Sequence, residues 1–239
     1  MKRKTVYLMI LLRLLAWFLG FGAACGLVRG QEEMKSEAKP KLSLAVLVDT
    51  SDHQKKVIEF EREAVNAIAD AFKSITLEAF VVGYADEVEL LQDWSPIKGL
   101  KAVSPRIELD SASGQNQCTL LYEALDTALL KLGTASSANS KVLIVIGEGN
   151  NAGGRLKYSE VKKRAKSAHV QCFVLLIADH NLMGGRVRHY GFDLYDLASA
   201  TKGKAYDIER SRKHLDKAIR DVVKRVNGIA KNQEGIPRS

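Results

Sequence analysis

The sequence predicts an α/β fold: a doubly wound, mostly parallel sheet of about six strands, with one antiparallel edge strand and helices on both faces. Three observations predict it. Short apolar runs rich in β-branched residues lie at 42–48, 142–146 and 170–178, and such runs are typical of strands buried on both faces. Helical patterns lie between these runs. The segment 76–94 holds two strand-like runs with no room for a helix between them, which predicts an antiparallel hairpin.

The helices follow from apolar stripes at helical spacing. Such stripes run through the segments 57–72, 120–132 and 211–230. A last short strand is expected at 203–208, directly before the final helix. The expected element order is therefore β-α-β-β-α-β-α-β-α-β-α, in which helices alternate with parallel strands.

The first thirty of the 239 residues have the pattern of a secretory signal peptide. A basic start, "MKRK", leads into an apolar stretch that ends in small residues, with cleavage expected near Ala24 or Gly30. An uncleaved membrane anchor over 5–28 is the alternative, and Arg13 in the middle of that stretch counts against it. Export is expected in either case. The chain is expected to be periplasmic, secreted or attached to a membrane only through this segment.

Three further segments complete the predicted organisation. Residues 31–40 are polar, end in proline and are expected to form a linker. The domain itself is expected over 41–230, followed by a C-terminal tail over 231–239. Within the domain, Cys118 is expected in a loop above the sheet and Cys172 low in a strand, so we expect two buried, unpaired thiols.

The formal net charge of +8 does not predict nucleic-acid binding. Five of these positive charges come from the first thirty residues, which contain no acid. In the rest of the chain acidic and basic residues are interspersed, as on an ordinary solvated surface. No nucleic-acid partner is therefore expected, and the sequence leaves the oligomeric state open.

Polar side chains gather where the predicted strands end. If the first and the central strand are neighbours, "DTSDH" and "IGEGNNAGG" after them converge with "GQNQCTLL" before the second main helix. Ligands of doubly wound sheets bind in such a crevice. Asp49 and Ser51 would point the same way in an extended stretch. With Thr119 and Glu148 they offer carboxylate and hydroxyl oxygens, which hard divalent cations prefer.

Five segments, in order, resemble the von Willebrand factor type A domain. "LVDTS" closes the first strand, "YADEVELLQDW" forms the hairpin, and "CTLLYEAL" resembles the helix start Gly-Thr-x-Leu-x-x-Ala-Leu of that family. "VLIVIGEGN" resembles the strand that normally ends in Asp-Gly, and "DLASATKGKAY" resembles the approach to the last strand. The likeness covers roughly residues 41–230 and suggests a divergent exported bacterial single-domain branch.

The resemblance implies a metal-ion-dependent adhesion site. Asp49 and Ser51 match the first two positions of its Asp-x-Ser-x-Ser motif, and Thr119 matches its threonine. His53 stands where the last serine belongs, and Glu148 stands where an aspartate belongs. The expected ion is Mg²⁺ or Mn²⁺, while an imidazole ligand suits Zn²⁺ better than Mg²⁺. The site is therefore expected to be degenerate.

Each of these residues also has a purely structural interpretation. Ser51 or Asp52 could cap the first helix, and Thr119 is a good N-cap for the helix over 120–132. Glu148 could satisfy loop amides, and His53 could be a solvated residue at a helix start. Capping explains each residue singly but does not explain why they collect above one crevice.

The leading functional prediction is a binding module and not an enzyme. In the resembling family an acidic side chain of a partner completes the shell of the ion. The partner here would be a protein or peptide outside the cytoplasm.

Two alternatives stay open. The first is a metal-free scaffold that binds partners through loops such as 181–192, which contains Arg186, Arg188, His189 and Tyr190. The second is a hydrolase with Asp49 as nucleophile. Such phosphohydrolases need a second aspartate two residues later, and position 51 is serine.

Overall fold

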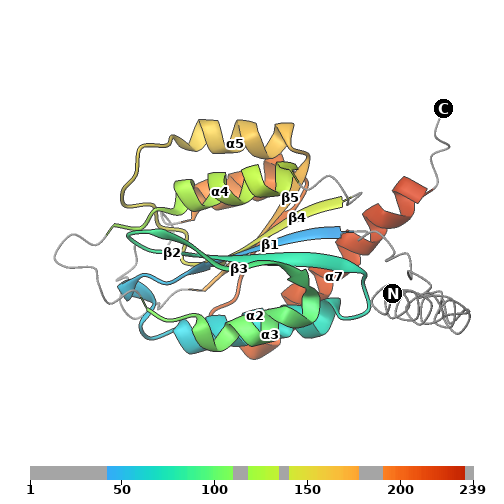
Figure 1. Cartoon of the computed structure of the whole chain (residues 1–239), viewed down its shortest axis with the longest axis horizontal. Helices are drawn as coiled ribbons and strands as arrows, with labels where there is room; N and C mark the ends of the chain where they lie inside the picture. The colour runs from blue at the N-terminus through green and yellow to red at the C-terminus, as the bar shows by residue number, and fades with distance from the viewer. Residues whose placement is uncertain (1–41, 110–117, 135–139, 178–190, 235–239) are drawn as a thin grey trace, which may run out of the picture. The chain divides into compact units, whose positions relative to one another are not determined.

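A six-stranded sheet between two layers of helices makes up the domain in a computed structural model of the chain, which describes residues 42–109, 118–134, 140–177 and 191–234 (Figure 1). The strands are β1 Leu42–Asp49, β2 Leu77–Tyr84, β3 Val88–Pro96, β4 Ser140–Gly147, β5 Val170–Leu176 and β6 Lys204–Asp207. The helices are α2 Ile58–Phe72, α3 Leu100–Val103, α4 Leu121–Thr134, α5 Tyr158–Ser167, α6 Phe192–Ala200 and α7 Arg212–Glu234. Short 3₁₀ turns lie at η1 Asp52–Gln54, η2 Ile97–Gly99 and η3 Ser104–Arg106.

The strand order across the sheet is β3-β2-β1-β4-β5-β6. β1 pairs in parallel with β2 and with β4, and only β3 runs antiparallel, at one edge. The predicted hairpin, the mixed sheet and the adjacency of the first and central strands are therefore confirmed. The winding reverses at β1, because the chain builds the sheet outward from this strand in both directions.

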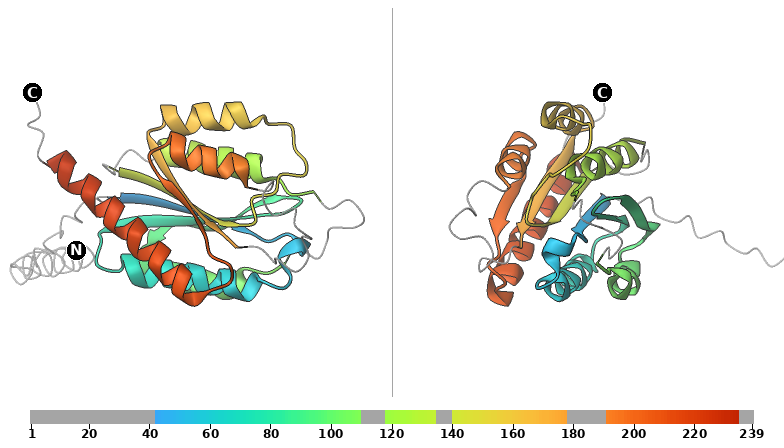
Figure 2. Two further views of the ribbon diagram at one scale, coloured as in Figure 1. Left: turned by 180° about the vertical axis from the view of Figure 1, so that it is seen from behind. Right: turned by 90° about the vertical axis from the view of Figure 1, so that its left-hand side faces the viewer.

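Side chains of β1 alternate between two apolar cores. Val46 and Val48 face α2, α3 and α7, while Ala45 and Leu47 face α4, α5 and α6. Figure 2 shows these two helical layers on opposite faces of the sheet. The apolar residues of β1, β4 and β5 are buried on both faces of the sheet, which explains the unbroken apolar runs in the sequence.

The structure differs from the sequence prediction in three details. A run of short helical turns from η2 to η3 follows the hairpin and was not expected; its Leu100 and Val103 complete the core beside α2. The last helix, α7, extends to Glu234 instead of ending at 230. Cys172 is buried and unpaired as predicted. Cys118 is also unpaired, but it is only half-buried and lies against Gly153 in the loop after β4.

The predicted signal peptide or anchor over 1–30 and the linker over 31–40 lie outside the described residues. Among the residues that the structure does describe, no helix is both long enough and apolar enough to cross a membrane.

Candidate functional site

Three adjacent strands bring Asp49, Tyr84 and Gly147 together at their carboxyl ends. Asp49 and Tyr84 are register partners and both are fully buried. Gly147 has φ +147°, and a Cβ built on it would lie 2.6 Å from Asp49 Cβ and 2.8 Å from the Tyr84 hydroxyl oxygen. Only glycine leaves the space that these two side chains occupy. The end of β4 is thus shaped around the aspartate.

Hydrogen bonds fix the Asp49 carboxylate in place. The backbone N–H of Ser51 donates to Oδ1 at 3.1 Å, and Gln54 Nε2 donates to Oδ2 at 3.4 Å. The turn η1 brings Gln54 back toward the strand end, since its N–H donates to the carbonyl of Ser51 at 2.8 Å. The segment after β1 therefore folds around Asp49 before α2 begins.

Thr119 is positioned by backbone hydrogen bonds on both sides. The N–H of Leu120 donates to the carbonyl of Ala85 at 2.9 Å, which ties it to the turn between β2 and β3. The Thr119 carbonyl accepts from the N–H of Ala152 at 3.1 Å, which ties it to the loop after β4. The described parts of the three polar segments singled out in the sequence therefore meet at one end of the sheet, and the Thr119 side chain is fully buried there.

Helix capping does not account for the two hydroxyls of this cluster. Ser51 precedes η1 but makes no side-chain capping bond, and its buried Oγ has no hydrogen-bond partner among the described residues. Thr119 Oγ1 is likewise buried without such a partner. The backbone N–H of Tyr122 lies in the first turn of α4, where a capping threonine would be expected to accept from it. It donates instead to Asn151 Oδ1 at 3.0 Å. Buried polar atoms are nearly always hydrogen-bonded, so each of these two hydroxyls requires a partner such as a water or an ion.

Glu61 is a member of this cluster that the sequence analysis missed. It lies in the first turn of α2, is fully buried, and neither carboxylate oxygen has a hydrogen-bond partner in the described part of the chain. Burial raises the pKa of Glu61 far above its usual range, and the charges of Asp49 and Glu148 raise it further. A signal existed in the sequence, because Glu61 stands four residues after Val57 within the apolar stripe of the helix.

Glu148 and Tyr84 complete the set of buried ionisable groups. Glu148 follows β4 directly and is 7% exposed, and burial raises its pKa. The Tyr84 hydroxyl is buried without a hydrogen-bond partner among the described residues. Burial is the main cause that raises the pKa of Tyr84, and the nearby negative charges raise it further; these come from Asp49, Glu61 and Glu148. Three carboxyls thus lie in one buried region, where the charges of Asp49 and Glu148 disfavour the ionised form of Glu61.

Two features of the predicted site lie wholly or partly outside the residues that the structure describes: the side chain of His53 and the loop over 181–192. The backbone of His53 belongs to η1, but its side chain is not among the described ones, so its role stays a prediction. Residues 181–190 of the loop considered as a binding surface also lie outside the described ranges. The end of that loop is described. Phe192 begins α6 and is 71% exposed, beside the loop that carries Glu148.

The donor set fits a hard divalent cation only if hydroxyl oxygens take part. Across the described residues, no three His, Cys, Asp or Glu side chains are grouped so that they could hold a metal ion. Asp49 instead supplies a hydrogen-bonded carboxylate, and Ser51 and Thr119 supply two hydroxyls that have no hydrogen-bond partner among the described residues, all buried at one sheet end. Oxygen atoms of this kind, completed by waters, suit Mg²⁺ or Mn²⁺.

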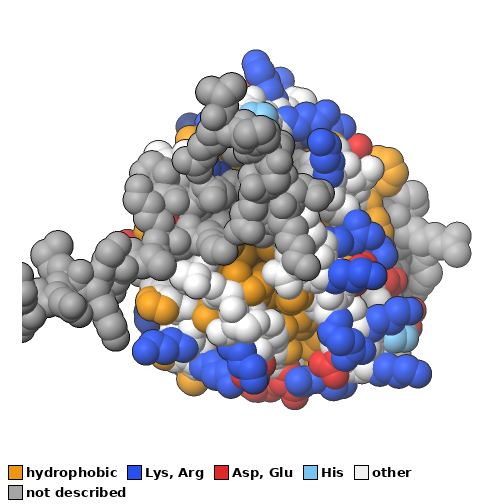
Figure 3. Space-filling model, turned by 90° about the vertical axis from the view of Figure 1, so that its right-hand side faces the viewer, with side chains coloured by type: hydrophobic (Ala, Val, Ile, Leu, Met, Phe, Trp, Pro, Cys, Tyr) orange, Lys and Arg blue, Asp and Glu red, His pale blue; other side chains and the backbone are white. Residues whose placement is uncertain are grey.

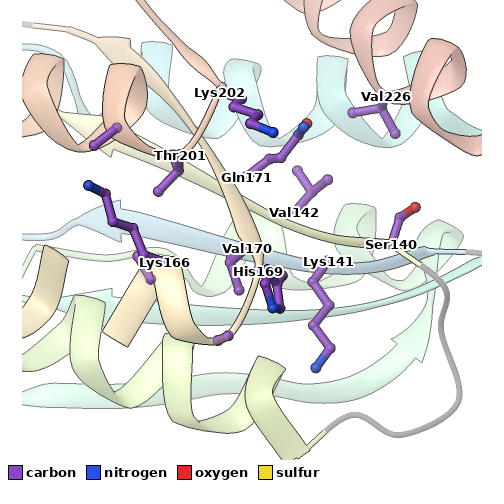
Figure 4. Close-up of a pocket in the computed structure, with 13 residues that line it drawn as sticks. Ser140, Lys141, Val142, Lys166, His169, Val170, Gln171, Thr201, Lys202 and Val226 are labelled. Atoms are coloured by element: carbon purple, nitrogen blue, oxygen red, sulfur yellow. The ribbon is translucent and has the colours of Figure 1, made fainter. Parts of the chain in front are cut away.

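A hollow of about 630 Å³ lies at the opposite end of the sheet from this cluster, where β4 and β5 begin (Figure 4). Lys141, Lys166, His169 and Lys202 line it, and the three lysine side chains point in different directions. Lys141 Nζ donates to the carbonyl of Gly133 near the end of α4 at 3.2 Å, and Lys166 lies in the last turn of α5. Figure 3 shows Lys and Arg side chains gathered around the visible part of this end. Positive charges stabilise helix C-termini, which accounts for this basic rim.

Comparisons with known proteins show the fold. No protein-family model matches the chain, and a search of curated proteins finds no match. Among solved structures, BatB from Bacteroides thetaiotaomicron aligns over 80% of this chain and 99% of its own, with 16% identity and a TM-score of 0.59. The PilB minor pilin from Streptococcus sanguinis aligns over 84% and 64%, with 12% identity and a TM-score of 0.57.

A third similar structure is a von Willebrand factor type A protein from Catenulispora acidiphila. It aligns over 77% of this chain and 42% of its own, with 15% identity and a TM-score of 0.57. This chain therefore spans just under two thirds of PilB and less than half of the Catenulispora protein. The strand order, the single antiparallel edge strand and these likenesses together show that the chain has the fold of a divergent von Willebrand factor type A-like domain.

Proposed function

We propose that this chain is a protein-binding module of the adhesion type that acts outside the cytoplasm through a divalent cation at the end of β1. One observation carries the proposal: the hydroxyls of Ser51 and Thr119 are buried at the same end of the sheet as Asp49 and have no hydrogen-bond partner among the described residues. An ion ligated by these oxygens satisfies them both. It also offsets the mutual repulsion of the buried carboxyls.

Each residue has a distinct role in this proposal. Asp49 supplies the negative ligand, and the bonds from Ser51 N–H and Gln54 hold it in position. The hydroxyls of Ser51 and Thr119 donate lone pairs, either directly or through water. Glu148 modulates the site from the end of β4. A cation held by these oxygens would in turn bind an acidic side chain of the partner protein or peptide.

Binding is proposed here in preference to catalysis. An aspartate-dependent phosphohydrolase needs an acid two residues after its nucleophile, and Ser51 occupies that position. The similar structures include a protein described as a minor pilin, which supports an extracellular or envelope location and protein contacts as the task of the domain.

Calorimetric titration of the purified chain with Mg²⁺, Mn²⁺ and Zn²⁺ tests the cation. The Asp49→Asn and Thr119→Val variants are compared with Asp52→Asn, a half-buried acid in η1 that serves as the matched control. We expect Mg²⁺ or Mn²⁺ binding that both site variants lose and the control keeps. Equal heats from wild type and Asp49→Asn would refute the site, and a preference for Zn²⁺ would point to His53.

A metal-free scaffold is the second candidate function, and one observation favours it. Phe192 is 71% exposed and Tyr195 44% exposed, both on α6 at the end of the 181–192 loop. Exposed aromatic side chains are frequent anchors of protein interfaces. If this surface binds the partner alone, Phe192→Ala abolishes retention of the partner while Asp49→Asn leaves it unchanged. If the cation is essential, Asp49→Asn and chelation abolish retention as well.

A further inference from the structure

We propose that Glu61 is an electrostatic component of the cation site: a buried carboxylate from α2 that strengthens cation binding and destabilises the metal-free chain. This inference rests on the proposed function and deepens it. It concerns a residue that lies outside the Asp-x-Ser-x-His segment, on a different element from every ligand named above.

The burial of Glu61 is unfavourable in the chain as it stands. Its relative exposure is 0%, and both carboxylate oxygens have no hydrogen-bond partner among the described residues. Unpaired acids are rarely fully buried, because an apolar environment replaces the water that stabilises their charge. The other buried residues of α2 are apolar: Ile58, Ala64, Val65, Ala67, Ile68, Ala69 and Phe72. A structural requirement alone would be met by another apolar side chain at position 61.

The helix dipole of α2 explains an acidic residue at position 61 only weakly. Negative charges near a helix N-terminus are favourable, and Glu61 lies in the first turn. Glu59 lies in the same turn, is exposed, and pairs with Arg62 at 2.5 Å. The exposed residue thus already complements the helix dipole without any burial. The dipole does not explain why a second acid faces the core.

The neighbours of Glu61 connect it to the cation site. Hydrogen bonds connect the turn that holds Asp49 to the start of α2. Gln54 Nε2 donates to Asp49 Oδ2 at 3.4 Å, and the Gln54 carbonyl accepts from the N–H of Val57 at 2.8 Å. The Val57 carbonyl in turn accepts from the N–H of Glu61 at 3.0 Å, which places Glu61 one helical turn beyond this contact. In agreement with this placement, the charges of Asp49 and Glu148 disfavour the ionised form of the Glu61 carboxyl. The negative charge of Asp49 repels a charged Glu61 carboxylate. A cation held at Asp49 would attract it instead, and the carboxylate would equally stabilise the bound cation. No three acidic side chains of the described ranges are close enough to ligate one ion together. We therefore assign Glu61 a role through its charge or through an intervening water.

This role predicts opposite effects of one substitution on two measured quantities. Glu61→Gln removes the charge and keeps the size of the side chain. We expect it to weaken Mn²⁺ binding by about tenfold or more, because the ion loses one buried counter-charge. We also expect it to raise the Tm of the metal-free chain in EDTA by about 2–4 °C, because an unpaired buried acid is gone. A merely structural glutamate would not give these opposite signs.

The experiment compares the full chain with Glu61→Gln, Glu61→Leu and Glu59→Gln, by Mn²⁺ calorimetry and by thermal unfolding with EDTA or saturating Mn²⁺. Glu59→Gln is the matched control, since it removes one acid from the same turn at an exposed position. Glu61→Leu is the second variant at this position. It allows the same measurements if Glu61→Gln folds poorly, since leucine packs in an apolar site. Both position-61 variants are expected to bind Mn²⁺ more weakly, with Glu59→Gln unchanged.

Two outcomes overturn the inference, and a further variant shows which proposal has failed. Wild-type Mn²⁺ affinity in both position-61 variants, with binding lost in Asp49→Asn, would refute the role of Glu61 and leave the cation site intact. A lower Tm in EDTA for both position-61 variants would show that Glu61 is a packing residue. If Asp49→Asn binds Mn²⁺ as well as the wild type does, the proposed function itself fails.

Discussion

The side chain of Asn151 caps α4 by accepting a hydrogen bond from the backbone N–H of Tyr122 at 3.0 Å. Asn151 belongs to the loop after β4, so the cap comes from a segment about thirty residues away and not from the threonine that precedes the helix. This relationship leaves the buried Thr119 hydroxyl without a structural task. It also joins two of the three segments that form the candidate site.

Substitution of Asn151 is expected to reduce stability, whereas substitution of Thr119 acts mainly on cation binding. Asn151→Ala removes the cap and should lower the free energy of unfolding by about 1 kcal/mol. Thr119→Val keeps the shape of the side chain, removes an unsatisfied hydroxyl, and should leave metal-free stability equal or higher. Urea unfolding in EDTA checks both. A loss of about 1 kcal/mol in Thr119→Val instead would show that Thr119 is the cap.

Gly147→Ala is expected to be strongly destabilising. Its Cβ would lie 2.6 Å from Asp49 Cβ and 2.8 Å from the Tyr84 hydroxyl oxygen, in a fully buried region with backbone φ +147°. Overpacking of this kind typically costs about 1–3 kcal/mol, and the backbone conformation adds to it. Gly228→Ala is the control, because no atom lies within 4 Å of a Cβ there and the residue is inside α7. Alanine there should stabilise by up to about 1 kcal/mol.

The stability of the metal-free chain should fall as the pH rises above about 5. The pKa of Glu61 is raised in the folded chain, mainly by burial, so the folded state binds more protons than the unfolded state once the pH exceeds the ordinary value of about 4.5. The free energy of unfolding then decreases by about 1.4 kcal/mol per pH unit for each such proton.

Unfolding in EDTA at pH 5, 6, 7 and 8 measures this slope. Carboxyls whose pKa is lowered, such as Asp196 beside Lys162 and Tyr158, lose their contribution at lower pH and do not obscure it. The slope should be smaller in Glu61→Gln, and equal slopes in the two proteins would assign the effect to other groups.

Lys202→Gly is expected to stabilise the chain. Lys202 follows the C-terminal end of α6 with φ +62°, a left-handed conformation that glycine adopts without steric cost. The gain should be about 0.5–1 kcal/mol, reduced in part because a positive charge near the helix C-terminus is lost. Lys202→Ala is the control, since it removes the same charge but keeps the Cβ. Equal stabilities of the two variants would show that the backbone conformation carries no strain.

The sequence by itself determined the architecture of this protein. The unbroken apolar runs at 42–48, 142–146 and 170–178 are typical of strands buried on both faces, and they predicted a parallel sheet between two helical layers. The hairpin over 76–94 was predicted because this segment is too short to hold a helix between its two strands. Asp49, Ser51, Thr119 and Glu148 were placed at one sheet end by the same reasoning, since parallel strands end at a common edge.

Only the tertiary structure decided which polar groups lack partners. The cap from Asn151, the short turns from η2 to η3 and the burial of Glu61 all depend on contacts between segments distant in the chain. An acid in a helical stripe has the same local spacing whether it meets a lysine, water or two other acids. Its environment is set by the strands packed against the helix, and the buried charges that distinguish this site therefore arise only when the sheet and α2 come together.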